Sequence, residues 1–131
     1  MPRFLNPATV PTPSSRYTQA IAVSAAAKRL IISGQVGMKP DGTVLKGLEA
    51  QTEQVFDNIL ALVKAAEMEV TDIVKIVTYC TVPGQMAVIR EVRQRKLGMH
   101  APASTLLIIA GLANPEFLIE IEAEAVKEAD I

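Results

Sequence analysis

The strongest pattern of apolar and polar positions in the sequence lies between Leu48 and Glu67. Apolar side chains recur there at spacings of three and four residues, which is the period of a helix with one buried face. They are Val55, Phe56, Ile59, Leu62, Val63 and Ala66. The same spacing returns in a second stretch, at Met86, Ile89, Val92 and Leu97. The pattern therefore predicts two amphipathic helices, the first of them long.

Short apolar segments rich in β-branched residues and bounded by turn residues predict the strands. They cover residues 17–23, 29–35, 73–79, 105–110 and 118–126. The first two follow each other along the chain and predict a hairpin with a long loop. Together with the helices they give the order ββαβαββ, which is typical of an α+β sheet with both helices on one face.

The last predicted strand, LIEIEAEAV, alternates strictly between apolar and acidic residues. Successive side chains of a strand point to opposite faces, so Glu120, Glu122 and Glu124 share the face that the helices leave free. The neighbouring segment TLLIIA is apolar on both faces and needs cover on that side too. We therefore expect the free sheet face to pack against other copies of the chain, with polar pockets where carboxylates such as Glu120 lie at the interface between the copies.

Composition sets the size and the charge of the protein. Of 131 residues, 50% are hydrophobic and 21% are charged, so we expect one folded domain over residues 1–131. Residues 1–16 hold four of the eight prolines, which predicts an extended N-terminal arm. The formal net charge of −1 argues against general electrostatic capture of nucleic acid or of an anionic membrane.

The chain has one cysteine, Cys80, and one histidine, His100. They allow no internal disulfide and no zinc-ligand cluster. We expect no metal site and no cofactor. No stretch reaches the roughly 20 apolar residues that cross a bilayer, and the first residues lack the apolar core of a signal peptide. We expect a cytoplasmic protein without a membrane partner.

An ordered set of segments resembles the Rid family, also called the YjgF or liver perchloric-acid-soluble protein family. The segments are SGQVGMKPDGTV, QTEQVFDNILALVKAAE, VTDIVKIVTYCTV, HAPASTLL and IEIEAEAV. No single segment is specific, but their order is, and the resemblance runs from about Tyr17 to Val126. It implies a chorismate-mutase-like α+β fold and a homotrimer with ligand pockets between subunits. The homotrimer agrees with the assembly expected from the free sheet face.

The resemblance also implies an activity and a set of site residues. The best-known members of the family hydrolyse reactive enamine and imine intermediates to 2-keto acids and ammonia, without a metal. Such a site must hold the substrate carboxylate and place a water against the C=N carbon. By resemblance, Glu120 positions the water, Tyr17 is the pocket aromatic, and Ser33 and Gly34 belong to the ligand-contacting loop.

The sequence departs from the family pattern at the residue that binds the substrate carboxylate. Where the family has P-A-R-S, residues 102–105 read PAST, so Ser104 occupies the arginine position and is followed by Thr105. Charge-assisted hydrogen bonds are worth about 1.5–3 kcal/mol each, so this change predicts altered substrate recognition at Ser104 and Thr105. Arg90, which stands at a position near the pocket in family members, is the candidate replacement. Alternatively, Arg90 belongs to a solvated helix face with Arg93, Arg95 and Lys96.

Three functions follow from these observations. The first is a hydrolase of small imines or enamines whose substrate recognition is altered at Ser104. The second is a trimer that binds a small metabolite in the same pocket without turnover. The third is implied by the resemblance, through an older naming of the family: an RNA-binding translation inhibitor of ribonuclease type, for which the basic residues 90–96 are the only support in the sequence. It ranks last, because no aromatic platform accompanies them and single-stranded RNA recognition normally relies on stacking.

Overall fold

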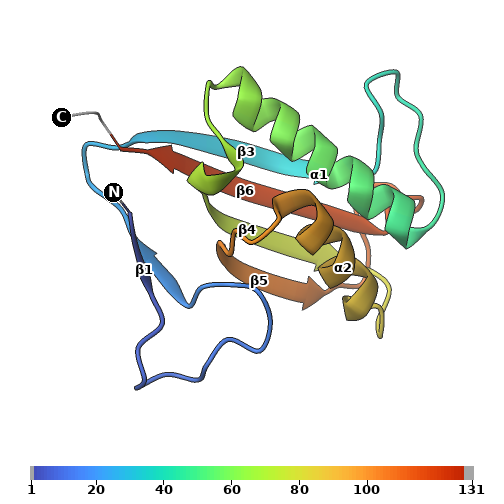
Figure 1. The fold of residues 1–131 in the computed structure, drawn as a ribbon. Helices are drawn as coiled ribbons and strands as arrows, with labels where there is room; N and C mark the ends of the chain where they lie inside the picture. Colours follow the sequence, from blue (N-terminus) through green and yellow to red (C-terminus); the bar gives the residue numbers. More distant parts are fainter. Residues whose placement is uncertain (1, 129–131) are drawn as a thin grey trace.

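A mixed four-stranded sheet with both helices on one of its faces forms the body of the molecule (Figure 1). The computed structural model describes residues 2–128. The helices are α1 (Leu48–Ala65) and α2 (Met86–Leu97), and the strands of the main sheet are β3 (Lys28–Val36), β4 (Ile73–Cys80), β5 (Ala103–Ile108) and β6 (Ile119–Lys127). A short 3-10 helix, η1 (Val70–Asp72), precedes β4, and two short strands, β1 (Arg3–Leu5) and β2 (Ala20–Ala22), form a separate small sheet.

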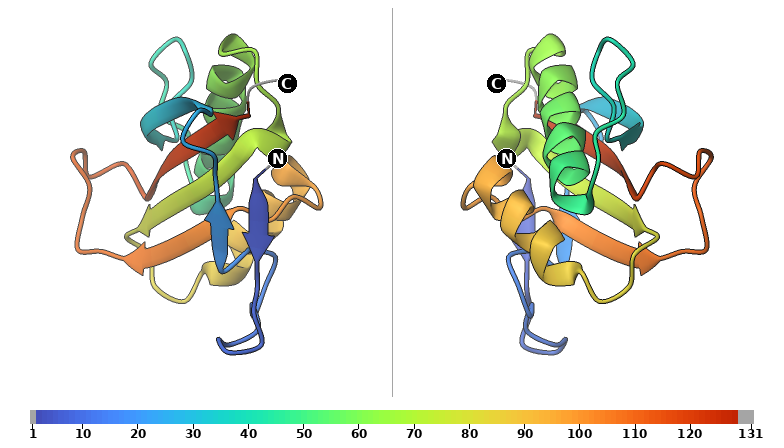
Figure 2. Two further views of the ribbon diagram at one scale, coloured as in Figure 1. Left: turned by 90° about the vertical axis from the view of Figure 1, so that its left-hand side faces the viewer. Right: turned by 90° about the vertical axis from the view of Figure 1, so that its right-hand side faces the viewer.

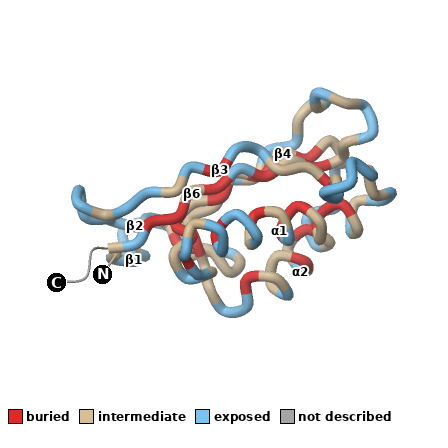
Figure 3. The backbone as a smooth tube through the Cα atoms, turned by 90° about the horizontal axis from the view of Figure 1, so that it is seen from above, coloured by how far each residue is buried: buried red, intermediate tan, exposed pale blue. Residues whose placement is uncertain are grey.

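The main sheet has the strand order β3-β6-β4-β5. β6 runs antiparallel to both of its neighbours, whereas β4 and β5 are parallel and are joined through α2. Seen from above, the two helices lie side by side below the sheet and leave its other face uncovered by any helix (Figure 3). The predicted α+β class with both helices on one face is therefore confirmed.

The predicted hairpin between residues 17–23 and 29–35 is wrong. β2 pairs with β1, with Phe4 opposite Ile21, and β3 pairs with β6 instead. The reason lies in Thr18, whose backbone N–H donates to Pro102 O and whose hydroxyl donates to Ala101 O. These bonds hold the start of the segment beside β5, at the opposite edge of the sheet from β3, as the side views show (Figure 2).

The N-terminal arm, predicted to be merely extended, contains the short strand β1. Three residues are too few to show an alternating pattern, so only the pairing with β2 defines this strand. The Phe4 ring packs edge to face against His100, with 5.9 Å between the ring centroids. His100 in turn lies within hydrogen-bonding distance of Ile73 O, which ties the arm to the start of β4.

The long helix α1 ends at Ala65, two residues before the predicted end at Glu67. Glu67 adopts a left-handed conformation, with φ of 60°, and the helical path stops there. Two lysines of the sheet donate to carbonyls at this end, Lys28 to Ala66 O and Lys127 to Glu67 O. Cations are favourable at a helix C-terminus, so these contacts stabilise the junction between α1 and the strands β3 and β6.

The core lies between the helices and the covered face of the sheet. The largest fully buried apolar side chains of this core come from both layers and are Phe56, Ile59, Ile73, Ile76, Ile119, Ile121, Val55, Val63 and Val92. Buried Gln51 ties α1 to the loop before it and to the segment before β6, because its amide donates to Leu45 O and Glu116 O and accepts from the Leu118 N–H. Within residues 2–128, no helix is both long enough and apolar enough to span a bilayer.

We expect Phe56→Ala to lower the free energy of unfolding by about 3–5 kcal/mol, because the buried ring leaves a cavity when it is removed. Leu62→Ala on the same helix is the matched control, since Leu62 is 40% exposed, and should cost less than about 1 kcal/mol. Urea unfolding of both variants measures the difference. Equal losses would contradict the assignment of the buried face of α1.

Candidate functional site

The sheet separates two polar regions, one on each face. β4 pairs with both β5 and β6, so its residues show which side chains of these two strands lie on the same face of the sheet. Ser104 of β5 lies opposite Ile76, which is buried under the helices. Glu120 of β6 lies opposite Tyr79, three residues further along β4 and therefore on the helix-free face. Within one chain, the structure thus places Ser104 and Glu120 on opposite sides of the sheet.

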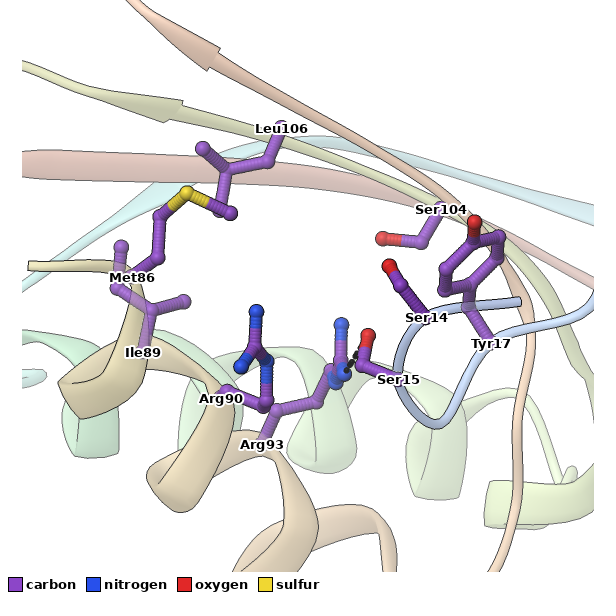
Figure 4. A pocket seen from close by; sticks show the side chains of 9 residues that line it. All are labelled: Ser14, Ser15, Tyr17, Met86, Ile89, Arg90, Arg93, Ser104 and Leu106. Carbon is purple, nitrogen blue, oxygen red and sulfur yellow. Dashed lines mark hydrogen bonds between the residues drawn. The ribbon is translucent and has the colours of Figure 1, made fainter. Parts of the chain in front are cut away.

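On the helix side, a cleft of about 240 Å³ opens between α2, β5 and the N-terminal arm. Figure 4 shows Arg90 and Arg93 reaching from α2 into the space beneath Ser104, with Tyr17 beside that serine. The lining residues are Ser14, Ser15, Tyr17, Met86, Ile89, Arg90, Arg93, Ser104 and Leu106. The polar groups gather at the end next to the arm, and the apolar groups Met86, Ile89 and Leu106 at the other (Figure 4).

The basic residues of α2 divide into two pairs. Arg95 forms ion pairs with Glu49 and Glu53 of α1, at 3.1 and 2.6 Å, and Lys96 pairs with Asp57 at 2.8 Å. Arg90 and Arg93 are three residues apart and share the other side of the helix, toward the cleft. Among residues 2–128, no carboxylate lies within ion-pair distance of either, although both are half-buried. The prediction of one solvated charged face therefore fails for this pair.

The electrostatic environment of the cleft is strongly cationic. Burial lowers the pKa of Arg93, and the positive charges of Arg90 and Arg16 lower it further. Arg93 Nη2 donates to Ser15 Oγ at 3.3 Å, and Arg16 donates to Gly98 O at 2.8 Å. None of the nine residues that line the cleft is acidic. The cleft can therefore bind an anion, because guanidinium groups pair well with carboxylate and phosphate oxygens.

On the helix-free face, Glu120 and Gly34 lie against each other. β3 carries a bulge between Ile32 and Gln35, at Ser33 and Gly34. A Cβ atom on Gly34 would overlap the Glu120 side chain and lie 2.7 Å from its Cδ. The absence of a side chain at Gly34 thus makes room for the carboxylate. Ser33 is exposed at the same bulge.

The remaining carboxylates of β6 have partners on that face. The Tyr79 hydroxyl donates to Glu122 Oε1 at 2.5 Å, and Glu124 pairs with Arg29 at 3.1 Å. The hydrogen bond to Glu122 raises the pKa of Tyr79, and partial desolvation and the charges of Glu122 and Glu120 raise it further. Glu120 has no such cation or hydroxyl partner among residues 2–128, and it remains available to a water or a ligand.

The structure therefore divides the predicted site residues between two places. Tyr17, Arg90 and Ser104 meet in the cleft, whereas Ser33, Gly34 and Glu120 gather at the bulge on the opposite face.

Thr105 belongs to neither group, because it follows Ser104 along β5 and points to the free face, where Lys75 Nζ donates to its hydroxyl. Sequence reasoning missed Arg93, Ser14 and Ser15 as residues of the cleft. The spacing of Arg90 and Arg93 was the available signal for the arginine, since residues three apart share a helix face. No spacing rule indicates that Ser14 and Ser15 lie beside α2. Within residues 2–128, no group of three or more His, Cys, Asp or Glu side chains has the arrangement of a metal site.

Nearly the whole chain is similar to known proteins. The sequence model of the family described as endoribonuclease L-PSP matches residues 8–127. A RutC family protein of Pyrococcus horikoshii is 36% identical over 120 residues, which cover 90% of this chain and 92% of that protein. A human protein named 2-iminobutanoate/2-iminopropanoate deaminase is 28% identical over 127 residues, which cover 95% of this chain and 90% of that protein.

Solved structures give the same result for the fold. The crystal structure of a Rid family protein of Yersinia pestis matches with a TM-score of 0.84 at 31% identity, covering 95% of this chain and 97% of that chain. RidA from the Antarctic bacterium Psychrobacter matches with a TM-score of 0.71 at 31% identity, covering 94% and 98% of the two chains. The fold that the sequence resemblance implied is therefore confirmed.

We expect Tyr79 to ionise above its ordinary pKa of about 10 and Glu122→Gln to shift this ionisation to lower pH, because the carboxylate opposes a second negative charge. Because the pKa of Tyr79 is higher in the folded protein than in the unfolded chain, the hydrogen bond to Glu122 stabilises the fold fully below the unfolded pKa. This stabilisation is lost as the pH rises through the folded pKa. Alkaline titration of phenolate absorbance measures both variants. Glu116→Gln serves as the control, and identical curves for native protein and Glu122→Gln would refute the interaction.

Proposed function

The chain belongs to the Rid family, also called the YjgF family, and from this premise we propose that it hydrolyses small reactive imines or enamines of 2-keto acids. In this reaction water adds to the C=N carbon, the water oxygen becomes the carbonyl oxygen, and nitrogen leaves as ammonia. No electrons are transferred, and an enamine first takes up a proton at carbon to become the imine. The site must therefore bind the substrate carboxylate and orient one water.

Arg90 holds the substrate carboxylate in this proposal. The supporting observation is that Arg90 reaches into the cleft that contains Ser104, the residue at the family's arginine position, and has no carboxylate partner among residues 2–128. A guanidinium from α2 thereby replaces one that β5 would carry in other members. Ser104 contributes a neutral hydroxyl, and the Tyr17 ring forms a wall beside it (Figure 4).

Glu120 positions the water, and Gly34 leaves the space that this carboxylate occupies. Because Glu120 and Arg90 lie on opposite sides of the sheet, we place the reaction between two subunits, with the cleft of one protomer facing Glu120 of the next. A head-to-tail contact of this kind closes into a ring, and the proposed ring is the homotrimer. Exposed apolar groups on the free face support such a contact, since Ile31 is 63% and Leu107 46% exposed.

The paired cations of α2 weaken the case for the RNA-binding alternative. Arg95 and Lys96 are neutralised by carboxylates of α1, so residues 90–96 do not form one continuous basic surface. The two remaining arginines point into a cleft that contains a single aromatic ring, Tyr17. A small anionic ligand fits this arrangement better than a nucleic-acid strand, which needs a charged groove and stacking platforms.

We expect Glu120→Gln to lower kcat by about 10²- to 10⁴-fold, because the amide cannot act as the base toward water. Arg90→Gln should raise KM about 10- to 100-fold through loss of charge-assisted hydrogen bonds. Release of ammonia and keto acid from freshly generated 2-iminobutanoate measures both. Arg95→Gln is the matched control, since it removes the same charge from the side of α2 that faces α1.

Full activity of Glu120→Gln would overturn the proposed role of Glu120. A native protein without activity that gains it with Ser104→Arg would instead support the binding trimer.

The shared site has its own test in mixed assemblies. Glu120→Gln and Arg90→Glu are each expected to be nearly inactive, but dissociating and reassembling them together in equal amounts should restore about a quarter of native activity, because a quarter of the interfaces then join two native halves. Activity of the mixture is compared with that of each variant reassembled alone. A mixture no more active than the variants would show that the two residues do not act across a subunit boundary.

A further inference from the structure

The cleft contains one more cation than a monocarboxylate substrate requires. Arg90 and Arg93 both enter it, both are half-buried, and neither has a carboxylate partner within residues 2–128. A charge that is partly removed from water is unfavourable unless an opposite charge compensates it. Binding of one carboxylate at Arg90 leaves Arg93 without a carboxylate partner among residues 2–128 of its own chain. A ligand with two negative groups neutralises both.

The position of Arg93 suits a second ligand contact. Its Nη2 donates to Ser15 Oγ at 3.3 Å, which holds the guanidinium at the arm end of the cleft. A guanidinium carries five N–H donors, so this single bond leaves others free for a ligand. Figure 4 shows the end of the Arg93 side chain beside Ser15, separate from that of Arg90, and both directed toward the same space below Ser104.

Two separate guanidinium groups distinguish between kinds of dianion. Side chains three residues apart on a helix start about 5–6 Å from each other, and these two present separate guanidinium groups to the same space, that of Arg93 beside Ser15 (Figure 4). A compact dianion such as inorganic phosphate carries both charges on one group, so it cannot give each guanidinium a separate carboxylate. A small dicarboxylate, with its charges at the two ends of a short carbon chain, can do so.

We infer that the preferred substrates are imines of 2-keto dicarboxylic acids, in which Arg90 binds the carboxylate next to the C=N carbon and Arg93 binds the carboxylate at the far end. This inference rests on the proposed function for its reaction, but its ligand class can be tested without turnover. Arg93 is then the residue that determines specificity. Replacement of the single β5 arginine by two arginines on α2 changes the ligand from a monoanion to a dianion.

The first experiment measures binding of non-reactive ligands to the native protein by calorimetry, with succinate, butyrate and inorganic phosphate as the probes. Succinate is expected to bind about tenfold or more tightly than the other two, and Arg93→Gln should remove most of this difference. Arg95→Gln, which makes the same charge change outside the cleft, should leave it unchanged. Butyrate or phosphate binding as tightly as succinate would overturn the inference.

The second experiment compares hydrolysis of imines made in place by an amino-acid oxidase from glutamate or aspartate and from 2-aminobutyrate. The ratio of kcat/KM should favour the dicarboxylates and fall about tenfold in Arg93→Gln. Equal or better hydrolysis of the monocarboxylate imine would overturn the inference and leave the proposed function intact. Preferential succinate binding without any hydrolysis would overturn the proposed function and leave the inferred ligand class intact. Absence of both succinate binding and hydrolysis would refute the inference and the proposed function together.

Discussion

The alternation of apolar and acidic side chains along β6 is the constraint on which the rest of the structure depends. β6 lies between β3 and β4, and its residues Ile119, Ile121, Ala123 and Ala125 must face the helices to complete the core. The period of two then fixes Glu120 on the opposite face, beside the glycine of the β3 bulge. The hydrophobic effect thus positions the candidate carboxylate. It also separates Glu120 from the cleft, so the proposed chemistry depends on a second copy of the chain.

Charge pairing between the helices has a comparable effect on the other side of the sheet. Carboxylates of α1 neutralise Arg95 and Lys96, which lie on the side of α2 that faces α1. Arg90 and Arg93 are left on the side toward the cleft, without acidic partners in the described part of the chain. The same ion pairs that join the two helices thus leave positive charge where an anionic ligand can bind.

The shape of the cleft is consistent with replacement of the family's β5 arginine, at the position of Ser104, by an arginine from another element. The cleft is bordered by a strand, a helix and an arm, and a guanidinium can enter it from more than one of these elements. With Ser104 short and neutral, the space that an arginine of β5 would fill is open to side chains from α2 (Figure 4). In the proposed site, the cation comes from the helix instead of the sheet, and the inferred selectivity for a dianion follows from the two arginines that α2 brings to the cleft.

The sequence by itself determined both helices, the main strands and the position of Glu120 on the helix-free face, because the spacing of apolar residues predicts which side chains are buried. It placed Arg90 near the pocket only by resemblance to a family, and it could not separate Arg90 and Arg93 from Arg95 and Lys96. That separation depends on where α1 lies relative to α2. Only the tertiary structure decided that β2 pairs with β1 and that the arm borders the cleft. The first contact joins strands of three residues, too short to show a pattern, and the second joins residues about 80 positions apart, as in Ser15 with Arg93. Contacts at such distances leave no local pattern in a sequence, since they arise from packing of elements that are each stable for other reasons.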